Sequence, residues 1–501
     1  MWGVPLVLIL IVLPGVAFYR LFLSPLSHIS GPPYACISPL FLHAVCYIGI
    51  EGRVLLHYHE KYNTPVLRIG PNAVSLSSPD ALYPVYIVGG GLPKDARYKN
   101  FRVEGHDTIF SSVDTAYRDA RAKAVLPLFA PSRIRASCEN GVCGDLIQRF
   151  IDTLRSRREE SLSKPSGTQR KVDILDLSSR LSIDILTAFL FNKTYGGLDE
   201  REGKVDGYTG NRLTKKLSAT PFVLAIVAFS RFSLLPNWLF TLVFSLLMGP
   251  TLSKPEVAAS LAKVSQFVNS IADGKEIDSC YNTYQSRLLA AAISPEETLI
   301  QCKAAMFAGA DSTAVMLSTI LFHLVRRPAV RQRLKREIQG RQPGADYQSL
   351  PYLQAVIREG LRLGMANPAR LTRVVPPRSP GCTVSGVFLP PGTIVGAAAY
   401  TLHHNPEVFP RPFEFLPERW LISGRGQGFQ RLKESDIIPY GLGSRTCLGR
   451  NLANQQLYAT VARVVESNVL DGAVTCTESI ELIEWFNAEI KGHVLEIEWN
   501  C

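Results

Sequence analysis

The sequence predicts a mainly α-helical fold with a small β region (α+β), arranged as a single large domain behind an N-terminal transmembrane anchor. Three observations support this fold class. An uncharged apolar run opens the chain, helical patterns dominate residues 116–334, and short strand patterns occur only before and after that region. A few short strands beside many helices indicate one helical domain with a small sheet.

Composition excludes several classes of protein. The 501 residues contain 54 Lys and Arg against 43 Asp and Glu, but no basic block typical of a nucleic-acid-binding arm. We therefore expect no nucleic-acid partner, and the positive excess favours lipid headgroups or an acidic protein partner. The ten cysteines are scattered without a CxxC pair, which argues against a zinc site or a disulfide framework and indicates a reducing compartment.

The N-terminus predicts a membrane anchor over residues 1–23. No charge occurs from Trp2 to Tyr19, and these 18 residues would span about 27 Å as a helix. A cleaved signal peptide is the alternative, but no basic residue precedes the run and no A-x-A-like site follows it. The basic residues Arg20 and Arg53 come after the span, so the body is expected in the cytosol.

The body is expected over residues 34–501, after a stiff proline hinge at residues 24–33. Two short strands joined by a Gly-Pro-Asn turn are predicted at residues 66–76. The helical region carries a polar linker at 161–171, and strand patterns return at 383–396 and 491–499.

Residues 221–249 contain a single charge, Arg231, and allow three interpretations. A second membrane span is disfavoured because Arg231 and Pro236 divide the segment into pieces too short to cross. Buried core and a lid over an apolar substrate channel both stay open.

The apolar helix predicted at residues 298–327 has an unusual centre. Gly309 disfavours a helix interior, and Asp311 places a carboxylate in apolar surroundings. Ser312 and Thr313 can hydrogen-bond back to the helix backbone and loosen it. A functional kink, where a small ligand sits and protons are relayed, would explain all four residues.

Cys447 lies in the segment PYGLGSRTCLGR, residues 439–450, directly before an amphipathic helix. A cysteine nucleophile would need a histidine base, and none occurs in the forty residues before it. An iron-ligating thiolate fits better, because loop amides and a helix N-terminus stabilise a thiolate and glycines allow a flat macrocycle to approach. Arg445 could then meet a carboxylate of that cofactor.

This segment resembles the F-x-x-G-x-R-x-C-x-G signature of the cytochrome P-450 haem-thiolate monooxygenases. Gly443, Arg445, Cys447 and Gly449 match it, with Tyr440 in place of phenylalanine. Other segments are similar to further motifs of this family, and the resemblance covers some 380 residues. These segments are AGADST at 308–313, with Ser312 at the usual threonine, Glu359-x-x-Arg362, and Pro417-Glu418-Arg419-Trp420.

The resemblance implies the cytochrome P-450 fold and bound haem b. Cys447 would be the axial iron ligand, with Arg445 and Arg373 at the haem propionates. Arg121 would join them if the segment Tyr117–Arg121 is the family's aromatic-x-x-x-Arg motif, with Lys123 as the alternative. Asp311, Ser312 and Thr313 would deliver protons to bound O2.

The resemblance also implies the partners and the reaction. A reductase would pass NADPH electrons to the haem, and the enzyme would hydroxylate or epoxidise an apolar small molecule. The pattern looks fungal and microsomal, which suggests the endoplasmic reticulum membrane and a terpenoid, polyketide or alkaloid intermediate of secondary metabolism. A haem-thiolate isomerase or dehydratase that needs no O2, and a non-catalytic haem protein, are the alternatives.

Overall fold

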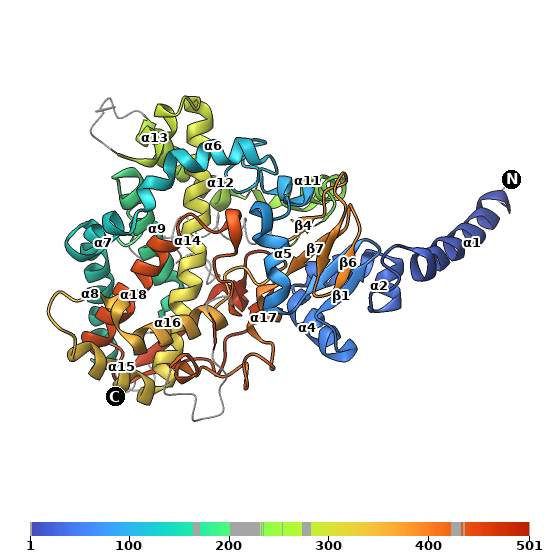
Figure 1. The fold of residues 1–501 in the computed structure, drawn as a ribbon. Helices are drawn as coiled ribbons and strands as arrows, with labels where there is room; N and C mark the ends of the chain where they lie inside the picture. The colour runs from blue at the N-terminus through green and yellow to red at the C-terminus, as the bar shows by residue number, and fades with distance from the viewer. Residues whose placement is uncertain are drawn as a thin grey trace.

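The computed structural model describes residues 3–163, 171–200, 231, 233, 235–252, 254–272, 282–421, 432–433 and 436–499. Helices form most of one large body, the four-stranded sheet lies at one side of it, and helix α1 projects away from the body (Figure 1). The expected mainly α fold with a small β region is confirmed.

The helices of the described residues have the following bounds: α1 Gly3–Phe18, α2 Pro33–Ile37, α3 Leu40–Ile48, α4 Glu51–Tyr62, α5 Leu82–Tyr86, α6 Thr115–Val125, α7 Pro131–Asn140, α8 Val142–Leu162, α9 Ile174–Phe191, α11 Asn237–Leu252, α12 Pro255–Ala272, α13 Tyr284–Ala290, α14 Pro295–Arg326, α15 Pro328–Gln339, α16 Pro351–Leu363, α17 Ala399–His403 and α18 Arg450–Glu466.

The strands of the described residues form four small sheets. The largest has the order β1-β2-β7-β4, in which only β2 and β7 are parallel. The others are β3-β11-β8 and the two-stranded sheets β5-β6 and β9-β10. The strand bounds are β1 Val66–Gly70, β2 Ala73–Leu76, β3 Val172–Asp173, β4 Arg373–Val374, β5 Cys382–Val384, β6 Val387–Leu389, β7 Ile394–Ala397, β8 Ala473–Thr475, β9 Leu482–Ile483, β10 Glu489–Ile490 and β11 Glu496–Trp499.

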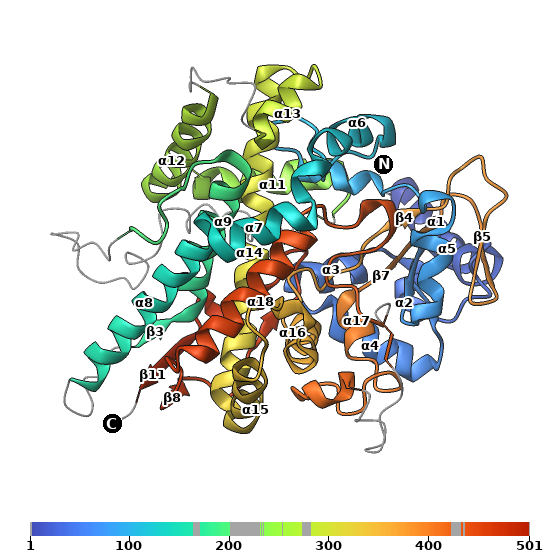
Figure 2. The ribbon, with the colours of Figure 1, turned by 60° about the vertical axis from the view of Figure 1, so that its left-hand side comes forward.

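Helix α14 is the centre of the hydrophobic core, with α9 and α18 packed beside it (Figure 2). It is the one helix in the described part of the chain that is long and apolar enough to cross a membrane, but 67% of that apolar window is buried in the body. Its length and apolar character therefore reflect its place in the core.

Gly309 lies at the close contact between α14 and α9. A Cβ at this position would lie 2.7 Å from Leu186 Cδ1 on α9, so a larger residue would require this leucine side chain to move. Helix α14 is continuous through Gly309 and Asp311, and the expected kink is not present as a break in the helix.

The segment at residues 24–33 packs closely on β1. The Arg68 N–H donates to Ser30 O at 2.8 Å, and the Arg68 guanidinium donates to Arg20 O at 2.8 Å. A Cβ at Gly31 would lie 2.0 Å from Arg68 O, which leaves room only for glycine. The end of the apolar N-terminal segment is thereby fixed to the sheet.

Helix α11, in the described part of residues 221–249, has one exposed and one packed face. Trp238, Leu242 and Leu246 are 72%, 53% and 65% exposed. Leu239, Phe240, Val243 and Phe244 pack against the buried Leu235 and Val257. Phe244 also lines the large cavity. This arrangement fits both the core and the lid interpretation, and residues 221–230 lie outside the described part.

A buried ionic network joins α16 to the loop that follows α17. Glu359 Oε1 is 2.7 Å from Arg362 Nη2 and 3.1 Å from Arg419 Nε, and these three side chains are no more than 1% exposed. The Trp420 indole N–H and the Leu416 N–H also donate to the carboxylate. Burial raises the pKa of Glu359, but the charges and hydrogen bonds of Arg362 and Arg419 outweigh it and hold this pKa below its ordinary value.

His403 connects this network to the loop that carries Cys447. Its Nδ1 lies 3.0 Å from the carbonyl oxygen of Arg362, which can only accept, so Nδ1 carries the proton. Nε2 then accepts from the Ile438 N–H at 2.8 Å. Burial lowers the pKa of His403 to about 3, so the ring stays neutral and keeps both roles at physiological pH.

Replacement Arg362→Ala is expected to prevent folding into a haem-binding form. It leaves the Glu359 carboxylate buried with one of its two cations missing, a loss of roughly 3–5 kcal/mol. The measurement is the yield of soluble, haem-loaded protein and its urea midpoint. A matched control is Arg155→Ala, which removes an i,i+3 pair of the same kind whose side chains are about half exposed, 48% and 51%, and should lose under about 1 kcal/mol. Full haem loading of Arg362→Ala with only turnover reduced would contradict a structural role.

Candidate functional site

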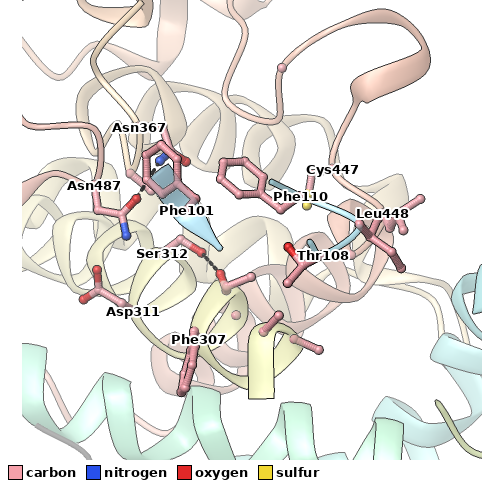
Figure 3. Close-up of a pocket in the computed structure, with 18 of the residues that line it drawn as sticks. Phe101, Thr108, Phe110, Phe307, Asp311, Ser312, Asn367, Cys447, Leu448 and Asn487 are labelled. Carbon is pink, nitrogen blue, oxygen red and sulfur yellow. Dashed lines mark hydrogen bonds between the residues drawn. The ribbon is translucent and has the colours of Figure 1, made fainter. Parts of the chain in front are cut away.

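A cavity of about 730 Å³ lies between α14 and the Cys447 loop. Its other walls come from residues 98–110, from the segment after α16 and from the turn between β9 and β10. Cys447 and Ser312 line opposite sides of this space, and Figure 3 shows the Phe110 ring beside Cys447 and the Phe101 ring beside Asn367. The cavity therefore brings together residues more than 300 positions apart in the chain.

The loop before α18 holds Cys447 by its backbone. The Cys447 N–H donates to Tyr440 O at 2.9 Å, and the exposed surface of this residue faces the cavity. Burial raises the pKa of the Cys447 thiol above its ordinary value, although the N–H groups of Gly449 and Arg450 and the Arg450 charge act in the opposite direction. A bound metal cation would favour the thiolate strongly.

The glycines of this loop have more than one role. Gly443 has φ of +67°, and a Cβ there would lie 1.8 Å from Tyr86 O, so this glycine allows the loop to approach α5. Gly443 does not line the cavity, whereas Gly449 does, and a Cβ on Gly449 would lie at ordinary contact distance, 3.9 Å, from Cys447 Sγ. Of these two glycines, only Gly449 is placed where it could allow a flat macrocycle to approach.

Six cationic side chains line the same cavity. Arg102 and Lys303 pair with Asp107 and Glu104. The other four, Lys94, Arg118, Arg373 and Arg445, form a cationic cluster. Arg118 pairs with the exposed Asp119, and Arg445 donates to Thr115 Oγ1 at 3.1 Å. Arg445 Nη1 is buried without a hydrogen-bond partner among the described residues. A carboxylate placed beside Arg445 would find a donor that the protein itself leaves unused.

The electrostatics of this cluster confirm that its cations lie close together. Burial lowers the pKa of Lys94 well below its ordinary value, and the charges of Arg373, Arg445 and Arg118 lower it further. Burial and the Arg118 charge also lower the pKa of Arg445. A dianionic ligand would relieve this mutual repulsion.

Arg121 does not reach the cavity. Its guanidinium binds Glu297 on α14, with Nη2 2.8 Å from Oε2, and it stacks on the Tyr117 ring 3.4 Å away. Neither Arg121, where a propionate contact was expected, nor its alternative Lys123 lines the cavity, whereas Arg118 on α6 does. Asp114 caps α6 by accepting from the Ala116 N–H at 2.8 Å, which orients the first turn that carries Arg118.

Asp311, Ser312 and Thr313 all line the cavity from α14, across from Cys447. Ser312 Oγ donates to Ala308 O at 2.9 Å, the expected bond to the helix backbone. Burial raises the pKa of Asp311 to about 6, while His493 lowers it and Glu489 raises it. A carboxyl group with such a pKa can gain and lose a proton near neutral pH.

The cavity fits haem on its own chemistry. Among the described residues no three His, Cys, Asp or Glu side chains are grouped closely enough to hold a metal ion. A metal bound by Cys447 would therefore need its other ligands from a non-protein group. Haem supplies four such ligands and carries two carboxylates, which match Cys447 and the cationic cluster.

Most of the residues expected from the sequence line the cavity: Cys447, Arg445, Arg373, Gly449, Tyr440, Asp311, Ser312 and Thr313. Lys94, Asn367 and Asn487 also line it but were not expected, because they lie outside any recognisable pattern. Arg118 lies inside the segment Tyr117–Arg121, where the expected motif assigned the cavity contact to Arg121. The capping Asp114 is the one local signal that could have pointed to Arg118.

Comparison with known proteins agrees with this geometry. The family profile described as Cytochrome P450 matches residues 32–469. The chain is 49% identical to cytochrome P450 monooxygenase mfmF of Annulohypoxylon moriforme, over the whole length of both proteins. It is 28% identical to cytochrome P450 monooxygenase hkm5 of Aspergillus hancockii, covering 95% of this chain and 90% of that protein. It is also 28% identical to N-acetyltryptophan 6-hydroxylase ivoC of Emericella nidulans, covering 97% and 94%.

A profile match over most of the chain and a relative of nearly half-identical sequence agree with the cysteine loop, the buried Glu359 network and the cavity between Cys447 and α14. The chain belongs to the cytochrome P450 family and is a monooxygenase, an oxidoreductase.

Proposed function

We propose that this enzyme binds haem b through Cys447 and uses O2 to hydroxylate or epoxidise a largely apolar small molecule of fungal secondary metabolism. The observation that carries the proposal is the cavity in which one cysteine faces an acid and a hydroxyl, with a cationic cluster at its side. When bound, the haem supplies O2 binding and oxidation of the substrate.

The chain's own residues would hold and orient the haem. Cys447 would ligate the iron, and Arg373, Arg445, Arg118 and Lys94 would bind its carboxylates. Charge-assisted hydrogen bonds of this kind are about twice as strong as neutral ones. They would also fill the unused donor at Arg445 Nη1.

Asp311 and Ser312 would manage protons on the opposite side. The Ser312 hydroxyl is tied to Ala308 O, so it offers its lone pairs and, after rotation, its proton to the cavity. Asp311, with its pKa near 6, would exchange protons between Ser312 or a water and the protein exterior. Thr313 is 6% exposed and would support the helix wall.

The aromatic lining supports an apolar substrate, and a reductase would supply NADPH-derived electrons. The N-terminal segment supports attachment to the endoplasmic reticulum membrane with the body cytosolic. Helix α1 and the π-helical turn Tyr19–Leu23 would together span about 31 Å. Exposed apolar side chains cover this segment, including Ile11 at 68% and Phe22 at 64%.

An isomerase or dehydratase that needs no O2 is the alternative. Retention of both Asp311 and Ser312 at the cavity favours O2 chemistry, because a proton relay serves O2 reduction. Product formation without NADPH and O2 would favour the alternative.

Cys447→Ala should abolish the red-shifted absorption of the thiolate-ligated ferrous haem–CO complex and all activity, because the protein then lacks an axial sulfur. Absorption spectra of the reduced, CO-treated protein measure this. Ser312→Ala is the matched control, since it removes a cavity-lining group on the opposite wall and should keep the spectrum. A thiolate spectrum in Cys447→Ala would exclude Cys447 as the ligand.

Asp311→Asn should reduce kcat by roughly tenfold to a hundredfold while KM changes little, because it removes a proton donor and keeps the shape. The carboxyl is protonated below its pKa of about 6 and ionised above it. Wild-type turnover should therefore fall as pH rises through about 6, and this step should be absent in the variant. Equal pH profiles for both proteins would show that Asp311 delivers no protons.

Removal of residues 1–23 should release most of the protein from microsomes, because the body loses its apolar helix. Fractionation and immunoblotting measure the released share. The truncated protein with Leu242→Gln and Leu246→Gln tests whether α11 adds a second membrane contact. In sealed microsomes, added protease should digest the intact protein, because the body is expected on the outer, cytosolic side. Full protection would show that the body lies inside the microsomes and would contradict this topology.

A further inference from the structure

Two side-chain amides meet on one wall of the cavity. Asn367 follows α16 and Asn487 lies in the turn between β9 and β10, and both line the cavity. Figure 3 shows them joined by a hydrogen bond beside the Phe101 ring. The two residues are 120 positions apart, so only the folded chain brings them together.

The hydrogen bonds fix which way each amide is turned. Asn367 Nδ2 donates to Phe486 O at 2.8 Å, and a carbonyl can only accept, so this end of the Asn367 amide must be the nitrogen. The same Nδ2 donates to Asn487 Oδ1 at 3.2 Å, which fixes the oxygen end of the second amide. One backbone carbonyl thereby orients both side chains.

This orientation leaves one acceptor and one donor unused. Among the described residues, Asn367 Oδ1 and Asn487 Nδ2 have no hydrogen-bond partner. A polar group that is half-buried in an aromatic cavity is stabilised when a ligand or a water completes its hydrogen bonds. The Asn367 acceptor and the Asn487 donor therefore match a ligand that carries a donor next to an acceptor on one edge.

The surroundings select a flat and neutral ligand. The rings of Phe101, Phe110 and Phe486 pack against each other with centroids 4.6–5.7 Å apart next to the amide pair. Ring faces and edges of this kind pack well against another planar ring. Lys303, a cationic residue that also lines the cavity, is already paired with Glu104 at 2.7 Å, so it does not require an anionic group on the ligand.

We infer that the substrate is a planar ring compound that carries a hydrogen-bond donor beside a carbonyl acceptor on one edge, as in a lactam, and that Asn367 and Asn487 read this edge. The ring N–H donates to Asn367 Oδ1, and the carbonyl accepts from Asn487 Nδ2. The inference rests on the proposed function, because it places the ligand in the same cavity as the haem. It makes the substrate less uniformly apolar than the aromatic lining alone suggests.

The test uses three bicyclic probes of similar size: 2-quinolone, which has the lactam edge, N-methyl-2-quinolone, which lacks the donor, and naphthalene, which lacks both groups. The Kd of each is measured on full-length, haem-loaded protein from the change in haem absorption. We expect 2-quinolone to bind at least about tenfold more tightly than N-methyl-2-quinolone, a difference of about 1.4 kcal/mol.

Asn487→Asp is the decisive variant. It keeps the shape of the side chain and the acceptor for Asn367 Nδ2, but turns the donor that faces the cavity into an acceptor. The Kd for 2-quinolone should rise about tenfold or more, while the Kd for naphthalene should change less than about twofold. Asn72→Asp is the control, because the exposed Asn72 amide donates to Gly392 O outside the cavity and should leave every Kd unchanged.

The outcomes separate this inference from the proposed function. If 2-quinolone binds no more tightly than its N-methyl derivative, including no binding by either, the inference is overturned. It is also overturned if Asn487→Asp weakens naphthalene and 2-quinolone equally, since the pair would then only shape the cavity. In both cases an intact thiolate spectrum of the ferrous CO complex leaves the proposed function standing. Because the probe comparison uses the wild-type protein, poor folding of Asn487→Asp would not remove the test.

Discussion

The buried carboxylate of Glu359 is the constraint on which the rest of the site depends. A carboxylate with no exposed surface is tolerable only if its hydrogen-bonding positions are filled, and Arg362, Arg419, Trp420 and Leu416 fill them. Arg362 lies on α16 and the other three donors lie within residues 416–420, so the carboxylate fixes α16 against the loop after α17. Arg362 then passes this constraint through neutral His403 to the Cys447 loop.

The cationic cluster in the cavity also needs an anion to balance its charges. Lys94, Arg118, Arg373 and Arg445 form a cluster that repels itself and that leaves a buried guanidinium nitrogen unused. In the Glu359 network the protein supplies the anion, whereas here we expect the cofactor to supply it. A ligand that binds only the folded chain stabilises it by mass action, so haem would complete the fold as well as the active site.

The sequence predicted the helical fold, the apolar N-terminal helix and the Cys447 loop because these are local patterns of composition and spacing. It could not predict contacts that only packing creates. Gly309 suggested a kink, but α14 is continuous through it, and its close approach to Leu186 on α9 exists only in the folded chain. Arg121 was expected to bind a haem propionate, but its guanidinium pairs with Glu297 on α14. Nothing in the linear sequence indicates that these two residues form a pair. Asn367 and Asn487 belong to no motif, and their joint orientation depends on one carbonyl of the folded backbone.

The wall opposite Cys447 combines polar groups of two kinds, and in our proposals one kind binds the substrate and the other transfers protons. Asp311 has a pKa near 6 and changes charge within the physiological range. The Asn367 and Asn487 amides do not titrate, so a neutral ligand held by them keeps its hydrogen bonds as Asp311 gains or loses its proton. If a second carboxylate read the substrate instead, binding and proton delivery would compete for the same protonation state. If amides bind the substrate and an acid transfers protons, as we propose, the enzyme would hold its substrate unchanged through each proton transfer.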